Sequence, residues 1–528
     1  MRSARGRRRR RSSPRRAFFA SLVLLTALAG CGGRPRPRVL VIGLDGATFD
    51  VVDSLLAEGV LPNLAALRDR GSTAVLETVL PAMSPPAWTS ATTGVNPGKH
   101  NIFDFFHLSK TGPQALLTSS LDRRARPVWT FLNAAGYKTG LMNIPLTFPP
   151  DRVDGFFISG FPYGAATTGF TYPAELEKEI GEYPLDLFGE SLPRGNEGLL
   201  LGHFRHTFAR QAAVAEELIQ KKDWDLFWVV FTGTDKVQHF FWKYADPKNP
   251  GYDAVGAAQF GDAIRDMFIR MDKVIGELVA RAGPNTDVIV MSDHGFSPIR
   301  EELRLQNWLR AEGFIAQDSS GAYTKVEAFP PGPFGGLLRV SQEGRDFGGQ
   351  IAPGAATEDV RRRLAERIAK VVDPKTGLPF AEHVYRREEL YHGPYVENGP
   401  DLVFVEAPTL FVGRGSPADT AVFGPPSYTF SGFHRPEGVF FAAGPRFRHD
   451  PQRQRASILG VTPTLYWLFD VPAPKDLDGE VFANLVRPDS LARRPARVGD
   501  ATAVVPPSDV AAPTDKDREV LKSLGYVQ

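Results

Sequence analysis

The chain contains 528 residues, of which 42% are hydrophobic and 23% are charged. A chain of this length buries a sizeable core, in one large domain with insertions or in about two to three smaller domains. The formal net charge of +2 conceals an uneven distribution, because residues 1–30 hold nine arginines and no acidic residue, which leaves the rest of the chain acidic. These values exclude a low-complexity chain and a protein that binds nucleic acid through a basic domain.

The first 31 residues have the pattern of an export signal. A basic segment at 2–16 is followed by an apolar segment, 17–29, that is too short to span a bilayer comfortably. Small residues then precede Cys31, the only cysteine. This arrangement resembles a bacterial lipoprotein signal, which implies that residues 1–31 are the signal, that Cys31 carries a lipid and that residues 32–37 are a tether.

We therefore expect the protein in the bacterial cell envelope, on the periplasmic side or at the cell surface, held to the membrane by its N-terminal lipid. Residues 12–19 also resemble a twin-arginine signal, so the export route stays open. A single cysteine excludes an intrachain disulfide and a cysteine nucleophile inside the fold.

The first predicted strand covers residues 39–44 and ends in Asp45 and Gly46. Helices are expected at about 49–58 and from residue 62 to a stop at Gly71. A strand followed by helices indicates βα architecture. Taken alone, Asp45 is better explained by capping of the following helix.

Ser84 precedes two prolines that fix the backbone where a helix over about 87–92 would begin, and Gly94 would end that helix. A hydroxyl at a helix N-terminus lies in the positive end of the helix dipole, near free N–H groups, which favours both a nucleophile and a bound phosphate. The alternative is that Ser84 only caps the helix.

An apolar strand at 226–231 leads into Asp235 and His239, whose spacing of four residues places both side chains on one face of a helix. Residues 253–282 then show helical spacing of apolar positions, with a stop at Gly283. A buried strand at 288–291 follows.

That strand runs directly into Asp293, His294 and Gly295. A carboxylate beside an imidazole suits a divalent ion such as zinc, and the glycine lets the backbone turn away. The alternative is an aspartate that caps the next turn beside an incidental histidine.

The βα pattern is interrupted after residue 300 by clusters of proline and glycine and a basic helix near 358–371, which we interpret as an insertion that could cap the site. His434 then precedes an apolar strand at 438–443, and a helix opens at about 462. The stretch 487–515 is rich in proline, alanine and aspartate and is expected to be a flexible tail, with 517–528 as a helix that docks back.

Three motifs together resemble the alkaline phosphatase superfamily, and within it the type I phosphodiesterase/nucleotide pyrophosphatase family. They are Asp45-Gly46, the Ser84 helix with the pattern from Thr93 to His100, and the segment 292–295. The further ligands of that family, an aspartate and a histidine four residues apart and a distant histidine, are matched in order by Asp235, His239 and His434.

The resemblance implies an α/β fold with a mostly parallel central sheet flanked by helices. It places the catalytic domain at 38–300 and 395–480, an insertion or cap at 301–394 and a C-terminal tail at 481–528. It also implies a hydrolase that uses two divalent metal ions of the zinc class. One ion would be held by Asp235, His239 and His434, and the other by Asp45, Asp293, His294 and the Ser84 oxygen.

In this interpretation Ser84 is the nucleophile that accepts a phosphoryl or nucleotidyl group. Three carboxylates against two divalent ions suit an anionic phosphate ester. A phosphodiester or pyrophosphate, from a nucleotide or a lipid head group, is the expected substrate, because no arginine near Ser84 is placed to hold the extra charge of a monoester. The insertion could supply one from 361–363.

The chain departs from the family at two positions. Nucleotide pyrophosphatases usually carry threonine as nucleophile and an asparagine three residues later, where this chain has Ser84 and Ala87. Another donor must then hold the phosphoryl oxygen, and Lys99, Asn143 or the backbone N–H after Ser84 are the candidates.

Other functions stay open at this point. A phosphomonoesterase or a phospho-group transferase would share the same ligands. A sulfatase is disfavoured, because the segment 84–88 has Trp88 where the sulfatase motif needs arginine. A non-catalytic metal-binding lipoprotein is the alternative outside enzymes.

Overall fold

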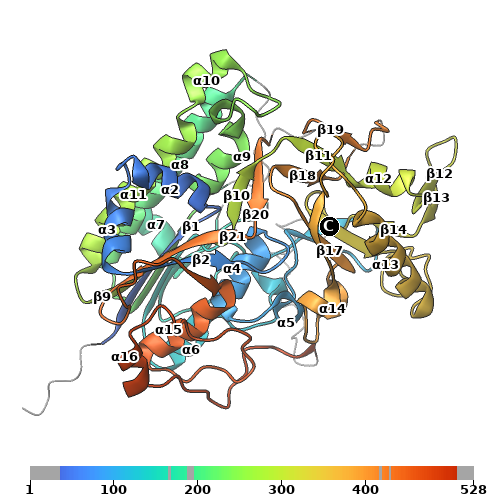
Figure 1. The fold of residues 1–528 in the computed structure, drawn as a ribbon. Helices are drawn as coiled ribbons and strands as arrows, with labels where there is room; N and C mark the ends of the chain where they lie inside the picture. Colours follow the sequence, from blue (N-terminus) through green and yellow to red (C-terminus); the bar gives the residue numbers. More distant parts are fainter. Residues whose placement is uncertain (1–35, 165–167, 187–194, 416–418, 427–429, 508–528) are drawn as a thin grey trace, which may run out of the picture. The chain divides into compact units, whose positions relative to one another are not determined.

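Nine strands form the central sheet of the computed structural model (Figure 1). The structure describes residues 36–164, 168–186, 195–415, 419–426 and 430–507. The expected lipoprotein signal with Cys31, most of the tether and the expected terminal helix at 517–528 lie outside these residues. In the part of the chain that the structure describes, no helix combines the length and the apolar character needed to cross a bilayer.

The order of the strands across the central sheet is β22-β2-β21-β9-β1-β8-β5-β6-β7. In chain order they are β1 (Arg38–Leu44), β2 (Ser72–Glu77), β5 (Thr139–Met142), β6 (Gly155–Ile158), β7 (Thr171–Tyr172), β8 (Leu226–Phe231), β9 (Thr286–Met291), β21 (Glu437–Ala443) and β22 (Gln454–Ser457). Five neighbouring pairs are parallel, and the pairs that involve β7 and β21 are antiparallel. The expected α/β fold with a mostly parallel sheet is confirmed.

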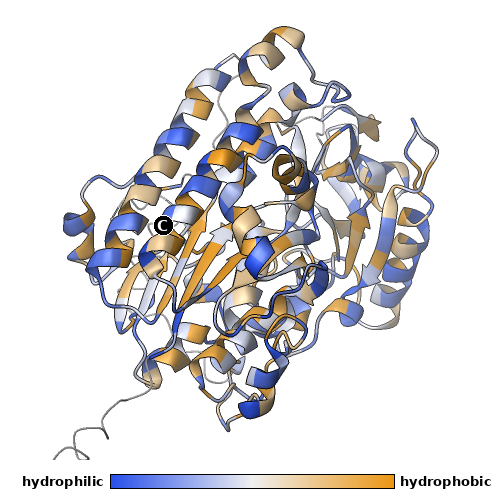
Figure 2. Cartoon of the chain, turned by 60° about the vertical axis from the view of Figure 1, so that its left-hand side comes forward, coloured by the Kyte–Doolittle hydropathy of each residue, from blue (hydrophilic) through white to orange (hydrophobic). Residues whose placement is uncertain are grey.

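Helices cover both faces of this sheet because its inner strands are apolar on both sides (Figure 2). Leu40 and Ile42 of β1 pack into one core, and Val39 and Val41 pack into the other. The first core is covered by α2 (Phe49–Ala57), α3 (Pro62–Arg70), α7 (Leu176–Ile180), α8 (Glu197–Lys221), α9 (Gly233–Ala245) and α11 (Ala263–Ala282). The second is covered by α4 (Ser84–Thr93), α6 (Val128–Ala134) and α15 (Val461–Phe469).

The helix expected from 253 to 282 is two helices. The first, α10 (Ala254–Phe260), begins where the Asp253 side chain accepts hydrogen bonds from the N–H groups of Val255 and Gly256, and the second is α11. The break falls at 261–262. Apolar periodicity alone does not reveal it, because Phe260 and the apolar residues of α11 pack against the same core.

The insertion forms its own small sheets with a separate core. Its elements are β11 (Glu301–Arg304), α12 (Leu305–Ala311), β12 (Ile315–Gln317), β13 (Tyr323–Val326), β14 (Ala328–Phe329), β15 (Gly336–Val340), α13 (Ala355–Ile368), β16 (Ala381–Arg386), α14 (Arg387–Leu390), β17 (Leu402–Glu406), β18 (Leu410–Gly413) and β19 (Phe423–Gly424). Strand pairing continues past the expected boundary at residue 394, because β17 pairs with β15 and β16 while β18 and β19 flank β11.

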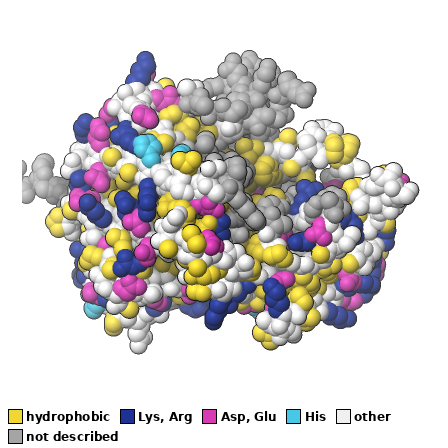
Figure 3. Space-filling model, turned by 90° about the horizontal axis from the view of Figure 1, so that it is seen from above, with side chains coloured by type: hydrophobic (Ala, Val, Ile, Leu, Met, Phe, Trp, Pro, Cys, Tyr) yellow, Lys and Arg dark blue, Asp and Glu magenta, His cyan; other side chains and the backbone are white. Residues whose placement is uncertain are grey.

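The remaining short elements connect these layers. They are α5 (Pro97–His100), β3 (Phe106–Leu108), β4 (Ala115–Leu117), β10 (Gly295–Pro298), β20 (Gly432–Arg435) and α16 (Pro488–Arg493). Seen from above, the surface carries basic and acidic side chains interspersed with apolar ones (Figure 3). No single sign of charge dominates the described residues on this face.

The expectation of a flexible tail from residue 487 is wrong for the described part of that segment. Residues 482–507 pack along the catalytic domain, where Val486 and Ala503 are fully buried. The Asp476 carboxylate accepts hydrogen bonds from the N–H groups of Ala503 and Val504 at 2.7 and 2.9 Å. Composition suggested disorder, but these long-range backbone hydrogen bonds hold the segment in place.

Candidate active site

The candidate residues meet at one edge of the central sheet. Because β1, β8 and β9 are parallel, their carboxyl ends lie side by side, and Asp45, Asp235 and Asp293 follow those ends. Strand β2 runs in the same direction and leads to Ser84. Strand β21 runs the opposite way, so its beginning, next to His434, lies at this same edge.

The turn after β1 is tight because Gly46 has a φ of +66°. A Cβ atom at this position would lie 2.9 Å from the Phe296 ring and 3.2 Å from the Cα of Asp235, so a larger residue would push these neighbours away. The Gly46 N–H donates to Asp293 Oδ1 at 3.2 Å, and Thr234 Oγ1 donates to the Asp45 carbonyl at 2.6 Å. These contacts bind the three strand ends to one another.

One group of ligands is formed by Asp235, His239 and His434. Asp235 Oδ2 lies 3.4 Å from His239 Nε2 and 3.3 Å from His434 Nε2, and the two Nε2 atoms are 3.0 Å apart. Asp235 and His239 lie on the same helix, α9, whereas His434 lies on β20. Three donor atoms at this separation could hold one metal ion.

The protonation of the two rings follows from their other nitrogen. His239 Nδ1 is 3.0 Å from the carbonyl oxygen of Gly432, and His434 Nδ1 is 3.0 Å from that of Ala82. A carbonyl oxygen only accepts, so each Nδ1 donates and each neutral Nε2 presents a lone pair to the other. Asp235 Oδ2 is buried beside them without a hydrogen-bond partner. A cation placed between these atoms would accept the lone pairs of His239 Nε2, His434 Nε2 and Asp235 Oδ2.

A second group surrounds Ser84. Ser84 Oγ lies 3.4 Å from Asp45 Oδ1 and 3.4 Å from His294 Nε2, and His294 Nε2 lies 3.3 Å from Asp293 Oδ2. His294 Nδ1 faces the Gly295 carbonyl at 3.1 Å, so its Nε2 also presents a lone pair. Asp293 Oδ2 is buried without a hydrogen-bond partner.

Asp235 is near enough to both groups to serve either. Its carboxylate lies within 4.8 Å of the donor atoms of Asp45 and His294 as well as those of His239 and His434. The resemblance assigns Asp235 to one ion alone, whereas the geometry places it between the two groups. Nitrogen and oxygen donors without a thiolate suit zinc or a similar divalent ion.

Burial and mutual repulsion perturb the carboxylates. Burial, with the charges of Asp293 and Asp235, raises the pKa of Asp45 well above its ordinary value. Burial and the charge of Asp235 raise the pKa of Asp293 to about 8. Burial also opposes ionisation of Asp235, but His239 and His434 outweigh it and hold its pKa well below the ordinary value. Divalent cations at this edge would offset the charge that these groups otherwise avoid.

Burial also disfavours the charged form of two of the imidazoles, those of His434 and His294. Burial, together with the neighbouring His294, lowers the pKa of His434 to about 3. Burial lowers the pKa of His294, although Asp45 and Asp235 act in the opposite direction. Neutral imidazole is the form that ligates a metal.

Ser84 is the first residue of α4 and is buried. The helix leaves few N–H groups near it, because Pro85 and Pro86 carry none and the Ala87 N–H donates to the Met83 carbonyl at 3.1 Å. The suggestion that a backbone N–H after Ser84 holds the phosphoryl oxygen is therefore wrong. The capping residue is Met83 and its side chain makes no cap, so the capping role considered for Ser84 does not apply either.

Trp88 is a site residue that sequence reasoning did not select. Its Nε1–H donates to Asp45 Oδ2 at 3.2 Å. The indole packs over Gly43, where an added Cβ would lie 2.5 Å from the ring. A buried tryptophan one helical turn after Ser84 was the available signal, since its N–H needs an acceptor.

A cavity of about 320 Å³ opens beside Ser84, Asp235, His239 and His434. Eight phenylalanines line it and define what we call the aromatic chamber: Phe105, Phe106, Phe161, Phe204, Phe240, Phe334, Phe430 and Phe433. Phe334 comes from the insertion, which therefore contributes to the wall. Apart from the metal-ligand candidates, the charged side chains that line the chamber are Asp104 and Lys236.

Comparison with known proteins settles the family. The model of the family described as type I phosphodiesterase / nucleotide pyrophosphatase matches residues 39–435. The chain belongs to the type I phosphodiesterase/nucleotide pyrophosphatase family. It is accordingly a hydrolase of that family. A search among curated proteins finds no match.

Solved structures of the ectonucleotide pyrophosphatase/phosphodiesterase 5 (ENPP5) share the fold. The murine protein has 15% sequence identity and a TM-score of 0.53, and the match covers 85% of this chain and 100% of that chain. An inactive variant of the murine protein, in complex with AMP, has 16% identity, a TM-score of 0.54 and the same coverage. The human protein has 14% identity, a TM-score of 0.53 and the same coverage.

Two residues proposed from the sequence as phosphate donors of this phosphodiesterase-family chain do not line its chamber. Lys99 forms an ion pair with Asp478 and donates to the Asp476 carbonyl at 2.7 Å. Asn143 is buried after β5, where its Oδ1 accepts from the Tyr183 hydroxyl at 2.6 Å. Both positions are decided by partners distant in the sequence. The cation that the chamber offers instead is Lys236, paired with Asp186 at 2.9 Å.

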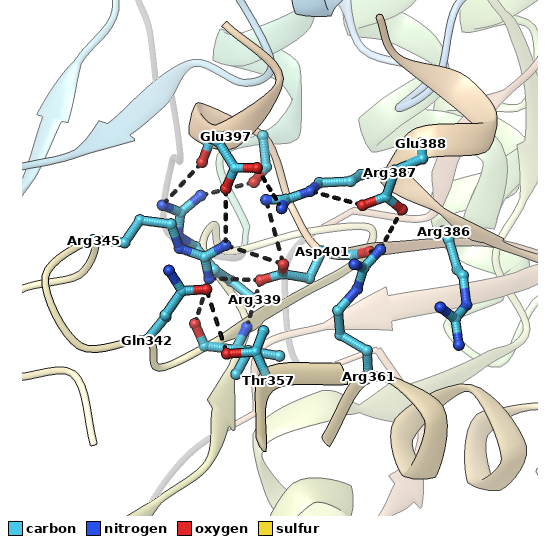
Figure 4. A network of polar contacts seen from close by, with 12 residues as sticks. Arg339, Gln342, Arg345, Thr357, Arg361, Arg386, Arg387, Glu388, Glu397 and Asp401 are labelled. Atoms are coloured by element: carbon cyan, nitrogen blue, oxygen red, sulfur yellow. Dashed lines mark hydrogen bonds and ion pairs between the residues drawn. The ribbon is translucent and has the colours of Figure 1, made fainter. Parts of the chain in front are cut away.

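The arginines of the insertion are also committed elsewhere. Arg361 pairs with Glu358 and Glu388 in a network of ion pairs that includes Arg345 and Asp401 (Figure 4). The next two arginines bind acidic residues as well, Arg362 at Asp359 and Glu366 and Arg363 at Glu327 and Asp359. None of the three lines the aromatic chamber. Their carboxylate partners stabilise the insertion, so the suggested supply of an arginine from 361–363 is not seen.

Proposed function

We propose that this family member is a metal-dependent phosphodiesterase that cleaves phosphodiester or pyrophosphate bonds through a covalent intermediate on Ser84. The observation that carries the proposal is the position of Ser84 Oγ, 3.4 Å from both Asp45 Oδ1 and His294 Nε2, on a residue that lines the chamber. A hydroxyl among metal-type ligands, with space beside it for a substrate, fits nucleophilic attack on phosphorus.

The donor set fits two divalent ions of the zinc class. Asp235, His239 and His434 would hold one, and Asp45, Asp293 and His294 the other, with Asp235 near both. Bound there, such ions would supply positive charge that lowers the pKa of the serine hydroxyl and offsets the charge of the phosphoryl group.

The residues of the chain then position the reaction. The prolines after Ser84 fix the start of α4, and Trp88 and Gly46 orient the carboxylates of Asp45 and Asp293 toward the hydroxyl. A bond from Ser84 Oγ to phosphorus forms as the bond to the leaving oxygen breaks, and the proton of the serine hydroxyl passes to the leaving oxygen, which departs as an alcohol or a phosphate. Water then attacks phosphorus and the bond to Ser84 Oγ breaks, so that the hydroxyl of water stays on the phosphoryl product and its other proton restores the serine hydroxyl.

The charges around the chamber favour a diester over a monoester. A diester carries one negative charge and a monoester about two near neutral pH. The chamber offers Lys236, already paired with Asp186, and no arginine among the residues that line it. The AMP bound to the ENPP5 variant supports a nucleotide as one candidate product, and the phenylalanine lining supports an ester group with an apolar framework, which leaves a lipid phosphodiester as the other candidate.

The test compares kcat/KM for matched aryl diester, monoester and sulfate substrates, with zinc supplied, for the parent protein and for Ser84→Ala. We expect the diester to be hydrolysed fastest and Ser84→Ala to lose about a thousandfold or more. A preference for the monoester or the sulfate would contradict the proposed substrate class. Undiminished activity of Ser84→Ala would contradict the proposed nucleophile.

We also propose that the enzyme acts in the bacterial cell envelope, attached through a lipid on Cys31. The support is the sequence pattern alone, a basic segment and a short apolar segment before the only cysteine. A lipid anchor would place the enzyme at a membrane surface, where phosphodiesters of lipid head groups occur.

A further inference from the structure

The aromatic chamber contains a carboxylate that the reaction does not use. Asp104 lines the chamber with Ser84 and the two histidines of the first ligand group, and its residue surface is only 8% exposed. It lies outside both groups of metal-ligand candidates. Among the described residues, no ion pair involves Asp104.

The cation that shares the aromatic chamber with Asp104 is already paired. Lys236, in the same chamber, faces Asp186 at 2.9 Å. Arg339, Arg345 and Lys110 line a neighbouring cavity of about 150 Å³ that Asp104 also borders. The ion pairs of the two arginines are with other carboxylates, of Asp346 and Asp401, and Lys110 is exposed and forms no ion pair with Asp104. Asp104 is therefore a buried acid without a counter-ion in the described structure.

A buried carboxylate without a counter-ion is costly. Burial raises the pKa of Asp104 to about 7, although the N–H groups of Phe105 and Phe106 act in the opposite direction. The hydrogen bond from the Phe105 N–H, at 2.5 Å, occupies Oδ1. Oδ2 lies over Gly332, where an added Cβ would lie 2.3 Å from it, so a side chain at position 332 would displace the carboxylate from this place.

The surroundings of the carboxylate are aromatic. Phe105 and Phe106 follow it directly, Phe161 stacks on Phe105 with ring centroids 5.8 Å apart, and Phe334 lies two residues beyond Gly332. The faces of aromatic rings carry partial negative charge and attract cations, and the attraction is strongest where water is excluded. Phenylalanine faces and one carboxylate together make a site for a positively charged group on an apolar framework.

We propose that the aromatic chamber binds a phosphodiester ester group that carries one positive charge on an apolar framework, a quaternary or primary ammonium, with Asp104 as its counter-ion. The preference in hydrolysis rests on the proposed function, whereas the binding of the cation does not depend on it. It makes Asp104 a specificity-determining residue. Ester groups that carry a carboxylate or a further phosphate would be repelled by Asp104 and bind less well.

A purely structural role for Asp104 is distinguishable. If the side chain serves only to accept the Phe105 N–H, then Asp104→Asn, which keeps an oxygen acceptor of the same size, leaves substrate preference unchanged. If its charge selects the substrate, the same variant loses the preference for an ammonium ester group over a neutral ester group.

The experiment uses the full-length zinc-loaded protein and two para-nitrophenyl phosphodiesters. One bears a trimethylammonioethyl ester group and the other its neutral carbon isostere, a dimethylbutyl group. We expect kcat/KM to favour the ammonium substrate by about tenfold or more in the parent, and by less than about threefold in Asp104→Asn. Asp489→Asn, which removes an exposed charge on α16, is the matched control and should keep the parental preference.

Equal kcat/KM for both substrates in the parent would overturn the proposal, and a preference that persists in Asp104→Asn would overturn the assignment to Asp104. If neither diester is hydrolysed, the proposed function fails. The binding of the cation is then tested separately, by calorimetry. Calorimetry then compares choline with dimethylbutanol, and tighter binding of choline to the parent, lost in Asp104→Asn, supports the site. Equal or absent binding of the two alcohols overturns it.

Discussion

His239 Nε2 and His434 Nε2 lie 3.0 Å apart, yet neither can donate a proton to the other, because each ring uses its Nδ1–H for a carbonyl oxygen. Two lone pairs and the unpartnered Asp235 Oδ2 thus converge on one point. This relationship is the strongest indication of a cation site among the described residues. The group around Ser84 has the same combination of a histidine lone pair, at His294 Nε2, and an unpartnered carboxylate oxygen, Asp293 Oδ2.

The first prediction concerns metal content. We expect the purified protein to bind about two zinc-class ions per chain, since two groups of donors share Asp235. His434→Ala should weaken one ion and Asp293→Asn the other, each by about tenfold or more. Elemental analysis after dialysis, followed by zinc titration against a chelator, measures both. One ion per chain in the parent, or the same ion weakened by both variants, would contradict the assignment.

The second prediction concerns the hydrogen bond from Trp88 to Asp45 Oδ2. Trp88→Phe removes the N–H and leaves an aromatic ring over Gly43, so Asp45 loses an orienting donor and zinc affinity should fall by about tenfold. Trp129→Phe is the matched control, because Trp129 is equally buried and donates to Asp151, a carboxylate outside the site. Equal zinc affinities of the two variants would mean that the hydrogen bond does not orient the ligand.

The third prediction tests the packing of α4 against the central sheet. A Cβ at Gly43 would lie 2.5 Å from the Trp88 ring and 2.8 Å from a methyl group of Val230, and both side chains are fully buried. Gly43→Ala should therefore reduce the free energy of unfolding by about 1–3 kcal/mol. Gly202→Ala is the control. Gly202 lies inside α8 with open space around it, so alanine there should stabilise by about 0.5–1 kcal/mol. Denaturant unfolding measures both, and an unchanged midpoint for Gly43→Ala would contradict the prediction.

The fourth prediction concerns acid stability. His100 is fully buried between Ser90 Oγ, at 2.9 Å, and the Ile102 N–H, and burial lowers its pKa from 6.5 to about 3. Below pH 6.5 His100 binds a proton in the unfolded chain but stays neutral in the folded chain. The free energy of unfolding therefore decreases as the pH falls from 6.5 toward 3. The loss across this window should reach about 3–5 kcal/mol.

His100→Asn should flatten that part of the pH profile, because asparagine does not titrate and still accepts the Ile102 N–H. The exposed His206, changed to asparagine, is the control and should leave the profile unchanged. Unfolding free energies measured at intervals between about pH 4 and pH 8 give the comparison. Parallel profiles for His100→Asn and the parent would show that His100 is not the group responsible.

The fifth prediction concerns attachment to the membrane. If Cys31 is lipidated, Cys31→Ser should leave an uncleaved precursor that incorporates no labelled fatty acid, whereas the parent should fractionate with membranes. Fractionation and N-terminal sequencing measure both. Recovery of the parent from the soluble cytoplasm with Met1 intact would overturn the proposed location.

The expected strands illustrate how much local sequence can show. Runs of apolar residues at 39–44, 226–231 and 288–291 predicted β1, β8 and β9, and the polar residues that follow them are the metal-ligand candidates. The parallel order of these strands brings their carboxyl ends together, so an aspartate after one strand implied a neighbour after the next. The absence of N–H groups at Pro85 and Pro86 was also visible in the sequence.

Other features depend on partners that local sequence does not reveal. The sequence made Lys99 a candidate phosphate donor, but in the structure its ammonium group forms an ion pair with Asp478, 379 residues away. The apolar residues of α10 and α11 keep the same helical spacing across the break between them, so the spacing of apolar residues does not reveal where one helix ends. Residues 487–507 have the composition of a tail but exchange backbone hydrogen bonds with the body.

The sequence by itself determined the α/β class, the family and the order of the ligand candidates, because these depend on short motifs and on apolar runs whose period is local. Only the tertiary structure decided which side chains face the substrate. The aromatic chamber joins Phe105, Phe161, Phe334 and Phe433, and Lys236 in that chamber pairs with Asp186 while Asp104 forms no ion pair among the described residues. Which side chains line the chamber and which charged groups pair depends on how segments distant in the sequence pack together. Local sequence patterns do not contain this information.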